Sequence, residues 1–196
     1  MPNVSAERLN ACKKNVRWIH SAVDNLPFPN VGRLRLSFGC FAIAQEHHAA
    51  IVFLTEHGYH ASAVALLRCL FEAFVRGSWL FACASEDQVR EFGNGEDPPR
   101  MQSLVEALET TSGFNNNVLS HFTKDRWRML CGYTHTGGIH VQRWQSDEGI
   151  EPKYSMQEIE EVLRFSENLG YLSVVGMAEG VNDQILAAKV HARIFG

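Results

Sequence analysis

The sequence predicts an all-α protein, an up-and-down bundle of about five to six helices. Apolar residues recur at helical spacing along nearly all of the 196-residue chain. No alternation typical of a strand lasts longer than a few residues, and no repeat is visible at a period of about 20–50 residues. We expect a single helical domain over residues 1–196, because domains run to roughly 100–200 residues.

Proline and glycine delimit the first three predicted helices. Leu9, Val16 and other apolar residues share a face of a helix over residues 4–25, which Pro27 stops. A second helix is predicted over residues 31–57, since Gly58 is a good C-terminal breaker. A third is predicted over residues 61–83.

Turn-rich segments separate the later predicted helices. Ser85 to Gln88 predicts a cap that leads into a short helical piece, and Ser155 with Glu158 forms a capping-box pattern. Thr123 is a candidate N-cap for the helix that it begins. Further helices are predicted over residues 100–111, 123–135 and 155–181, the last of them broken at Gly176 or Gly180 and followed by a tail helix to 195. Between them we predict a loop over 91–99, a link over 112–117, an extended piece over 139–144 and an acidic loop over 147–152.

Composition limits the classes of function. Eighteen Lys and Arg residues against 22 Asp and Glu residues give a net charge of −4. A sequence-blind nucleic-acid coat protein should be basic, so the net charge argues against this class. The cysteines are odd in number, five, and contain no Cys-x-x-Cys pair, which argues against a disulfide framework and a zinc ribbon. With no apolar signal core near the N-terminus, we expect a cytoplasmic protein.

One helix combines apolar character with a column of charges. Residues 61–84 are long enough to span a bilayer, but they include Arg68, Glu72 and Arg76, and each charge costs about 2.5–3.5 kcal/mol near the membrane centre. We therefore expect a buried helix of a bundle and no membrane span. The spacing of four residues places the charges in one column. Such a column is either an internal ion-pair network or the polar wall of a site.

A second feature is the spacing Arg128-x6-His135. Seven residues bring a helix within 20° of two full turns, so the guanidinium and the imidazole would share one face. Histidine can transfer a proton near neutral pH, and arginine can bind a phosphate in its transition state. This pair is a minimal set for metal-free RNA cleavage by the internal 2′-hydroxyl. The alternative is a histidine that caps carbonyls at the helix end and an arginine in a surface ion pair.

These residues resemble the HEPN superfamily, whose motif is Arg, four to six residues and His. The sequence is also similar to a group of bacterial HEPN-like proteins that share Arg-x-x-x-Glu on an apolar helix, here Arg68 and Glu72, and a later Tyr133-Thr134-His135. The likeness covers roughly residues 40–140. It implies a homodimer in which both Arg/His pairs line one cleft, and a metal-independent ribonuclease that acts as a toxin or phage-defence effector.

The resemblance assigns roles to residues of this chain. Arg128 would bind the scissile phosphate and His135 would be the general acid or base, while Arg68, Glu72, Tyr133 and Thr134 would support them. Other HEPN relatives have lost catalysis. The alternative function is therefore a non-catalytic HEPN-like module that binds a nucleotide or a partner protein, and a further one is a toxin whose target is not RNA. An antitoxin would be a partner of either toxin.

The candidate substrate-binding residues surround this motif: Lys124, Arg126, Trp127 and His140. Residues 124–143 carry a net charge of +3, which permits a local anion site within an acidic chain. Glu46, His47, His48 and His60 are metal-ligand types, but no His-Glu-x-x-His or paired Glu-x-x-His motif is present. We therefore predict no metal and no cofactor.

Overall fold

The computed structural model describes residues 4–27, 29–30 and 32–195, and it confirms the all-α bundle. The predicted helix start at Val31 lies outside the described residues. The helices formed by the described residues are α1 (Ala6–Val23), α2 (Gly32–Glu56), α3 (His60–Ala82), α4 (Glu86–Gly93), α5 (Met101–Leu108), α6 (Val118–Thr134), α7 (Gly138–Gln142), α8 (Met156–Gly180) and α9 (Gln184–Phe195).

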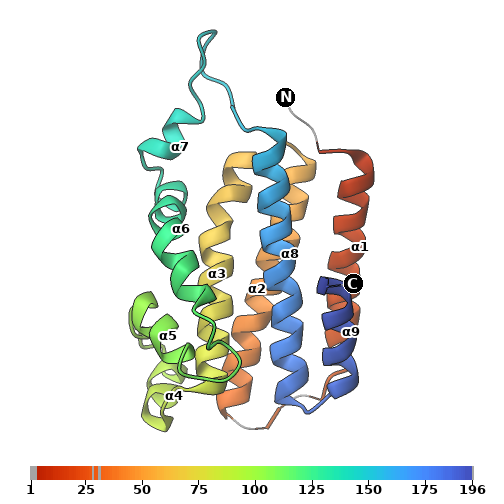
Figure 1. Cartoon of the computed structure of the whole chain (residues 1–196), viewed down its shortest axis with the longest axis vertical. Coiled ribbons are helices and arrows are strands. Elements are labelled where there is room, and N and C mark those ends of the chain that lie inside the picture. Colours follow the sequence, from red (N-terminus) through yellow and green to blue (C-terminus); the bar gives the residue numbers. More distant parts are fainter. Residues whose placement is uncertain (1–3, 28, 31, 196) are drawn as a thin grey trace.

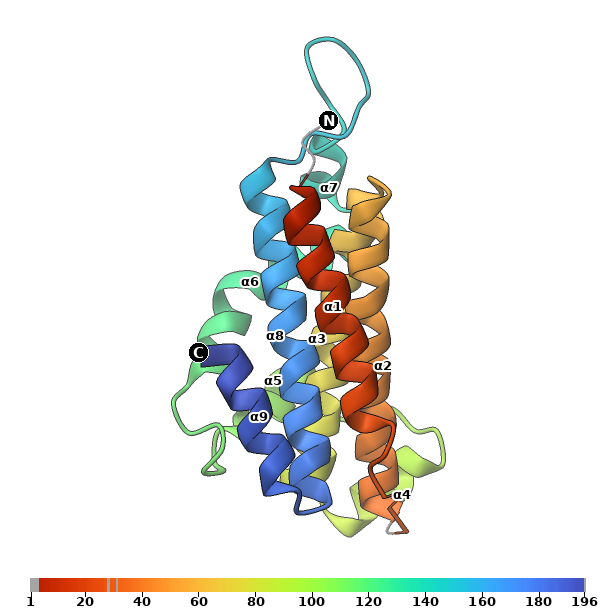
Figure 2. The same ribbon diagram turned by 90° about the vertical axis from the view of Figure 1, so that its right-hand side faces the viewer.

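The long helices alternate in direction along the chain (Figure 1). Helices α1, α2, α3, α6, α8 and α9, each of twelve residues or more, run in turn down and up the long axis. Helix α3 packs against α2 and α8 and also against α5 and α6. Figure 2 shows α1 between α2 and α8. The charged column of α3 therefore lies where the main bundle meets α5 and α6.

The core lies between α2, α3 and α8, and Phe41 of α2 is at its centre with 1% of its surface exposed. Gly77 of α3 and Gly176 of α8 both face its ring. A Cβ atom would lie 2.8 Å from the ring at Gly77 and 2.5 Å at Gly176. Gly176 therefore permits close packing of α8 against α2. The predicted break there is wrong, because α8 continues to Gly180.

The two predicted caps are confirmed. Ser85 at the start of α4 and Ser155 at the start of α8 each accept a hydrogen bond from the backbone three residues later. In return, the side-chain oxygens of Gln88 and Glu158 accept a hydrogen bond from the backbone N–H of the cap residue, which completes both capping boxes. Gly58 ends α2 with a φ of 77°, a conformation that favours glycine.

Three predicted boundaries differ from the structure. Thr123 is not an N-cap, because α6 begins five residues earlier, after Asn117 in the left-handed conformation, and Leu119 is buried in the added turn. The piece predicted to be extended at 139–144 instead begins within the short helix α7, since the described residues form no strand that could pair with it. Helix α4 occupies the first part of the predicted loop over 91–99.

Candidate functional site

The three charges of α3 form one continuous ion-pair column. Glu72 accepts a hydrogen bond from Arg68 Nε at 2.7 Å through one carboxylate oxygen and from Arg76 Nη2 at 2.9 Å through the other. The Glu72 side chain is 15% exposed and Arg76 is 37% exposed. The predicted ion-pair network is therefore present, and the column also lines a cleft.

His135 joins this column from the end of α6. Its Nε2 atom forms a hydrogen bond with Nη1 of Arg68. Arginine can only donate, so Nε2 is the acceptor and the imidazole carries its proton on Nδ1. His135 is exposed and caps α6 with its backbone N–H, which donates to Cys131 at 3.0 Å. Its side chain is thus available to solvent and does not cap the helix carbonyls.

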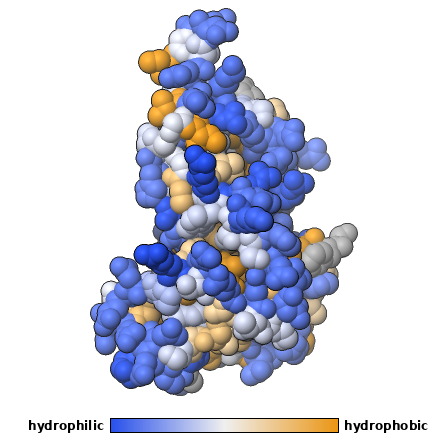
Figure 3. All heavy atoms as spheres, turned by 60° about the vertical axis from the view of Figure 1, so that its left-hand side comes forward, coloured by the Kyte–Doolittle hydropathy of each residue, from blue (hydrophilic) through white to orange (hydrophobic). Residues whose placement is uncertain are grey.

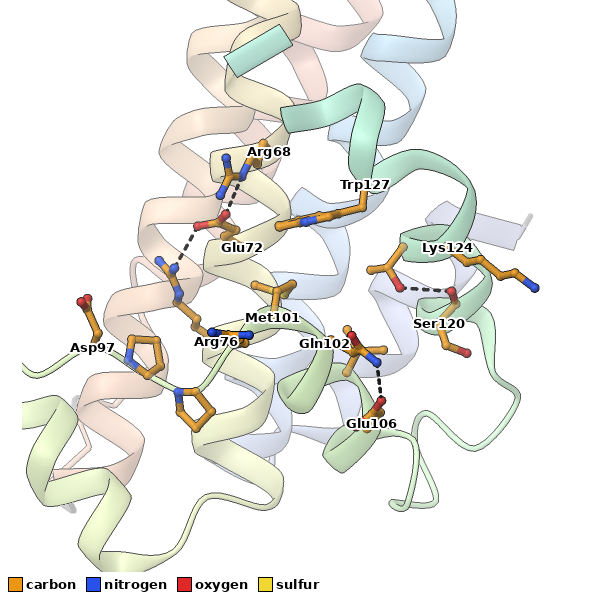
Figure 4. Close-up of a pocket in the computed structure, with 15 residues that line it drawn as sticks. Arg68, Glu72, Arg76, Asp97, Met101, Gln102, Glu106, Ser120, Lys124 and Trp127 are labelled. Carbon is orange, nitrogen blue, oxygen red and sulfur yellow. Dashed lines mark hydrogen bonds and ion pairs between the residues drawn. The ribbon is translucent and has the colours of Figure 1, made fainter. Parts of the chain in front are cut away.

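Trp127 lies beside the same arginine. The guanidinium carbon of Arg68 is 5.0 Å from the centre of the Trp127 ring, a cation–π contact. Figure 4 shows the indole of Trp127 extending from α6 toward Arg68 and Glu72 of α3. The contact places an aromatic surface next to the guanidinium of Arg68.

The charged column of α3 and Trp127 line a cleft of about 870 Å³ between α3, α5 and α6 (Figure 4). His135 is not part of its wall and reaches it only through its contact with Arg68. The wall of the cleft also includes Asp97 and Arg100 from the segment before α5, and Glu106 of α5. The Nε atom of Arg76 is buried and has no hydrogen-bond partner among the described residues. Four cations against three acids therefore line the cleft, with one donor unused. Lys124 lies at its edge and points away from the arginines.

Sequence reasoning missed the contribution of the α5 segment. Pro98, Pro99 and Arg100 all line the cleft. The sequence predicted only a loop that ends just before Arg100. The sole signal was the double proline, which imposes an extended backbone without revealing what it packs against.

Arg128 is not brought into this cleft. It is exposed, it does not line the cleft, and it forms no hydrogen bond or ion pair with the residues that the structure describes. The arginine that contacts His135 is Arg68, from a different helix.

Other predicted site residues lie on different faces of α6. The Thr134 hydroxyl donates to the carbonyls of Ala65 and Leu130, both at 3.0 Å, and so ties α6 to α3. Tyr133 is 6% exposed and packs edge-on against His140, with 5.3 Å between the ring centres. Arg126 lines a second pocket on the opposite side of α6. None of these three predicted residues lines the cleft.

The histidines considered as metal ligands are dispersed. His48 is buried against Ser166 of α8, with 3.1 Å between Nδ1 and Oγ. Burial lowers the pKa of His48 to about 4 and that of His60 below its ordinary value. Throughout residues 4–27, 29–30 and 32–195, no group of three or more His, Cys, Asp and Glu side chains is placed to hold a metal ion.

No helix among the described residues is both long enough and apolar enough to cross a membrane.

The fold and this site define a helical-bundle protein with a charged, tryptophan-lined cleft between α3, α5 and α6. Residues 41–193 match a family of unknown function, DUF6988, and the chain belongs to this family. No curated protein matches the chain, and no solved structure matches it.

Proposed function

We propose that this protein is a HEPN-like, metal-independent endoribonuclease that binds RNA in the cleft between α3, α5 and α6. The observation that carries the proposal is the hydrogen bond between the exposed imidazole of His135 and the guanidinium of Arg68. A proton-transfer group thus contacts a phosphate-binding group that lines the cleft, and the cleft also offers Trp127 for stacking against a base.

The chemistry uses these side chains, a second acid that protonates the leaving oxygen, and the RNA, and it requires no metal. The 2′-oxygen attacks the adjacent phosphorus, the bond from phosphorus to the 5′-oxygen breaks, and a 2′,3′-cyclic phosphate and a 5′-hydroxyl are formed. When Arg68 turns from the imidazole to the phosphate, Nε2 of His135 is free to accept the 2′-hydroxyl proton. Arg68 then stabilises the added negative charge of the transition state.

The departing 5′-oxygen needs a proton from a second acid. We propose that a second copy of the chain supplies it through its own His135, in a homodimer. Support comes from the exposed apolar side chains that follow His135, among them Ile139, Val141 and Trp144, which are 40%, 43% and 38% exposed. Figure 3 shows hydrophobic surface around this end of the molecule. Buried between two copies, this surface would bring the two histidines to one cleft.

Cleavage of a single-stranded RNA in EDTA tests the proposal. The wild type should produce 2′,3′-cyclic phosphate ends, and His135→Ala and Arg68→Ala should each lower the rate by about 100-fold or more. His121→Ala is the matched control, because His121 is exposed on the same helix and should leave the rate unchanged. Equal activity of the wild type and His135→Ala, or none in either, contradicts the proposal.

Arg128→Ala separates the two candidate arginines. If Arg68 binds the phosphate, Arg128→Ala should retain most activity. The HEPN motif assigns the phosphate to Arg128, and loss of activity in Arg128→Ala with retention in Arg68→Ala would restore that assignment.

We propose further that the enzyme acts in the cytoplasm, as a toxin or phage-defence effector held inactive by an antitoxin or another partner protein. Its five cysteines are free thiols, as expected in a reducing compartment. Expression in a bacterial host should slow growth, and His135→Ala should relieve the effect. Equal growth inhibition by both proteins contradicts the toxin role.

A second candidate is a non-catalytic module that binds a nucleotide. The size of the cleft favours it, since about 870 Å³ lies within the range of small-ligand sites. AMP binding measured by calorimetry should then be weakened by Trp127→Leu and unaffected by His135→Ala, without cleavage of RNA.

A further inference from the structure

A second pocket lies on the other side of α6 from the cleft. It has a volume of about 580 Å³ and is bounded by α3, α6 and α8. Apolar side chains form much of its wall, including Leu67 of α3, Phe122 and Met129 of α6, and Val162 and Phe165 of α8. Its volume and lining are typical of sites for small apolar ligands.

Two unpaired arginines lie at the opening of this pocket. Arg126 of α6 and Arg164 of α8 both line it and both are exposed. Neither forms an ion pair or hydrogen bond with any side chain in the described part of the chain. The arginines come from two helices and flank an apolar interior, so they give the opening an uncompensated positive charge.

The acidic residues of the pocket are already engaged. Glu158 forms an ion pair with Arg143 and accepts a hydrogen bond of 2.8 Å from the backbone of Ser155. Glu161 accepts a hydrogen bond of 3.2 Å from Gln157. Three arginines, Arg126, Arg143 and Arg164, line the pocket against these two glutamates, so its net charge is positive.

The inner wall contains an unpartnered donor. Tyr154 lines the pocket, is 3% exposed, and its hydroxyl makes no hydrogen bond of ordinary geometry with the described residues. Among the described residues, no group accepts the proton of this hydroxyl. A buried hydroxyl without an acceptor is costly. A ligand oxygen at the inner end of the pocket would accept this proton.

We propose that this pocket binds an amphipathic carboxylate, a molecule with an anionic head, an apolar body and an oxygen acceptor near its far end. The carboxylate binds Arg126 and Arg164 at the opening. The apolar body contacts the phenylalanines and Met129, and the distal oxygen accepts the hydrogen bond of Tyr154. The site does not depend on the ribonuclease proposal, since it contains neither His135 nor Arg68.

Calorimetry with decanoate, 9-oxodecanoate and decanamide tests the site. Both carboxylates should bind to the purified protein, decanamide about 10-fold more weakly, and 9-oxodecanoate more tightly than decanoate by about 5-fold because its ketone reaches Tyr154. Saturable binding that is equal for decanoate and decanamide would overturn the assignment of the head group. Absence of saturable binding for all three would overturn the site.

Matched variants locate each contact. Arg126→Gln and Arg164→Gln should each weaken decanoate binding by about 5-fold, whereas Arg17→Gln, on the exposed side of α1, should not change it. Tyr154→Phe should remove the preference for 9-oxodecanoate and keep decanoate binding. Leu67→Phe, which fills the pocket, should abolish binding of both, with circular dichroism to verify the fold. Binding that none of these substitutions changes would place the ligand elsewhere.

Discussion

Replacing Arg8 by alanine tests how α1 is held to α8. The guanidinium donates two hydrogen bonds to Glu167, of 3.1 and 2.7 Å, and one of 2.8 Å to Glu160. The Glu167 side chain is 10% exposed, and without Arg8 it keeps only the hydrogen bond from Asn15, at 2.7 Å. Removing one partner of a buried ion pair costs about 3–5 kcal/mol. Because Arg8 is 23% exposed, we expect a loss of about 3 kcal/mol, at the lower end of this range.

Urea unfolding followed by far-ultraviolet circular dichroism measures this loss. In thermal unfolding of a chain of this length, a loss of about 3 kcal/mol should lower Tm by about 6–12 °C. Arg17→Ala is the matched control on the same helix, since Arg17 is exposed, and it should change the free energy of unfolding by less than about 0.5 kcal/mol. Adding Glu167→Gln to Arg8→Ala should restore part of the stability, because glutamine leaves no unpaired charge.

The pH dependence gives an independent check. Burial raises the pKa of Glu167, but hydrogen bonds from Arg8 and Asn15 outweigh it and hold the pKa below its ordinary value. The stabilisation by Glu167 is therefore complete above the ordinary carboxyl pKa and is lost as the pH falls through the lower folded-state pKa. In Arg8→Ala, fewer hydrogen bonds oppose the burial of Glu167, so the pKa of Glu167 rises. The free energy of unfolding that the substitution removes should therefore be smaller at pH 4 than at pH 7. A cost equal at both pH values, or below about 1 kcal/mol at pH 7, refutes this reasoning.

Three further predictions concern the core. Gly77→Ala should lower the free energy of unfolding by about 1–3 kcal/mol, because its Cβ would lie 2.8 Å from a core ring. Gly39→Ala, in open space on α2, should raise it by about 0.5–1 kcal/mol; the same sign for both in urea unfolding would contradict the packing argument. Burial lowers the pKa of His48 to about 4, so the wild type should lose about 3 kcal/mol between pH 6.5 and pH 4 that His48→Gln does not lose. A constant difference between the two proteins would contradict this. Burial raises the pKa of Cys12 to about 12, so iodoacetamide should alkylate it only after unfolding, as peptide mass spectrometry would detect.

Local signals in the sequence predicted most of the fold. The capping boxes at Ser85 and Ser155 and the glycine at position 58 act through atoms within a few residues, so spacing alone reveals them. Gly176 looked like the same kind of signal. Its role depends on the ring of Phe41, more than 130 positions away in sequence. Without knowledge of that neighbour, a glycine that ends a helix cannot be distinguished in the sequence from a glycine that permits close contact between two helices.

The site was predictable within each helix and not between helices. Arg68, Glu72 and Arg76 were placed correctly, because spacings of four residues fix which side chains meet on one helix. Arg100 was not found, since nothing local to the double proline before it indicates that α5 packs beside α6.

The pairing of His135 with Arg68 shows where spacing alone fails. The seven-residue separation from Arg128 places two side chains on one face only while the helix remains regular. Helix α6 ends at Thr134, and His135 adopts a non-helical φ of −103° and ψ of 20°. The imidazole is therefore oriented by the last turn and by the neighbouring helix, and it contacts the arginine of α3. If the ribonuclease proposal is correct, the helix end selects which arginine serves the histidine. A substitution that lengthened α6 through residues 135–137 should then move activity from dependence on Arg68 toward dependence on Arg128. Gly137→Ala is one such change, because its Cβ would lie 3.1 Å from the backbone of Gly132 and so disfavours the present turn. Cleavage that still depends on Arg68 alone in a helix-extended variant would refute this selection.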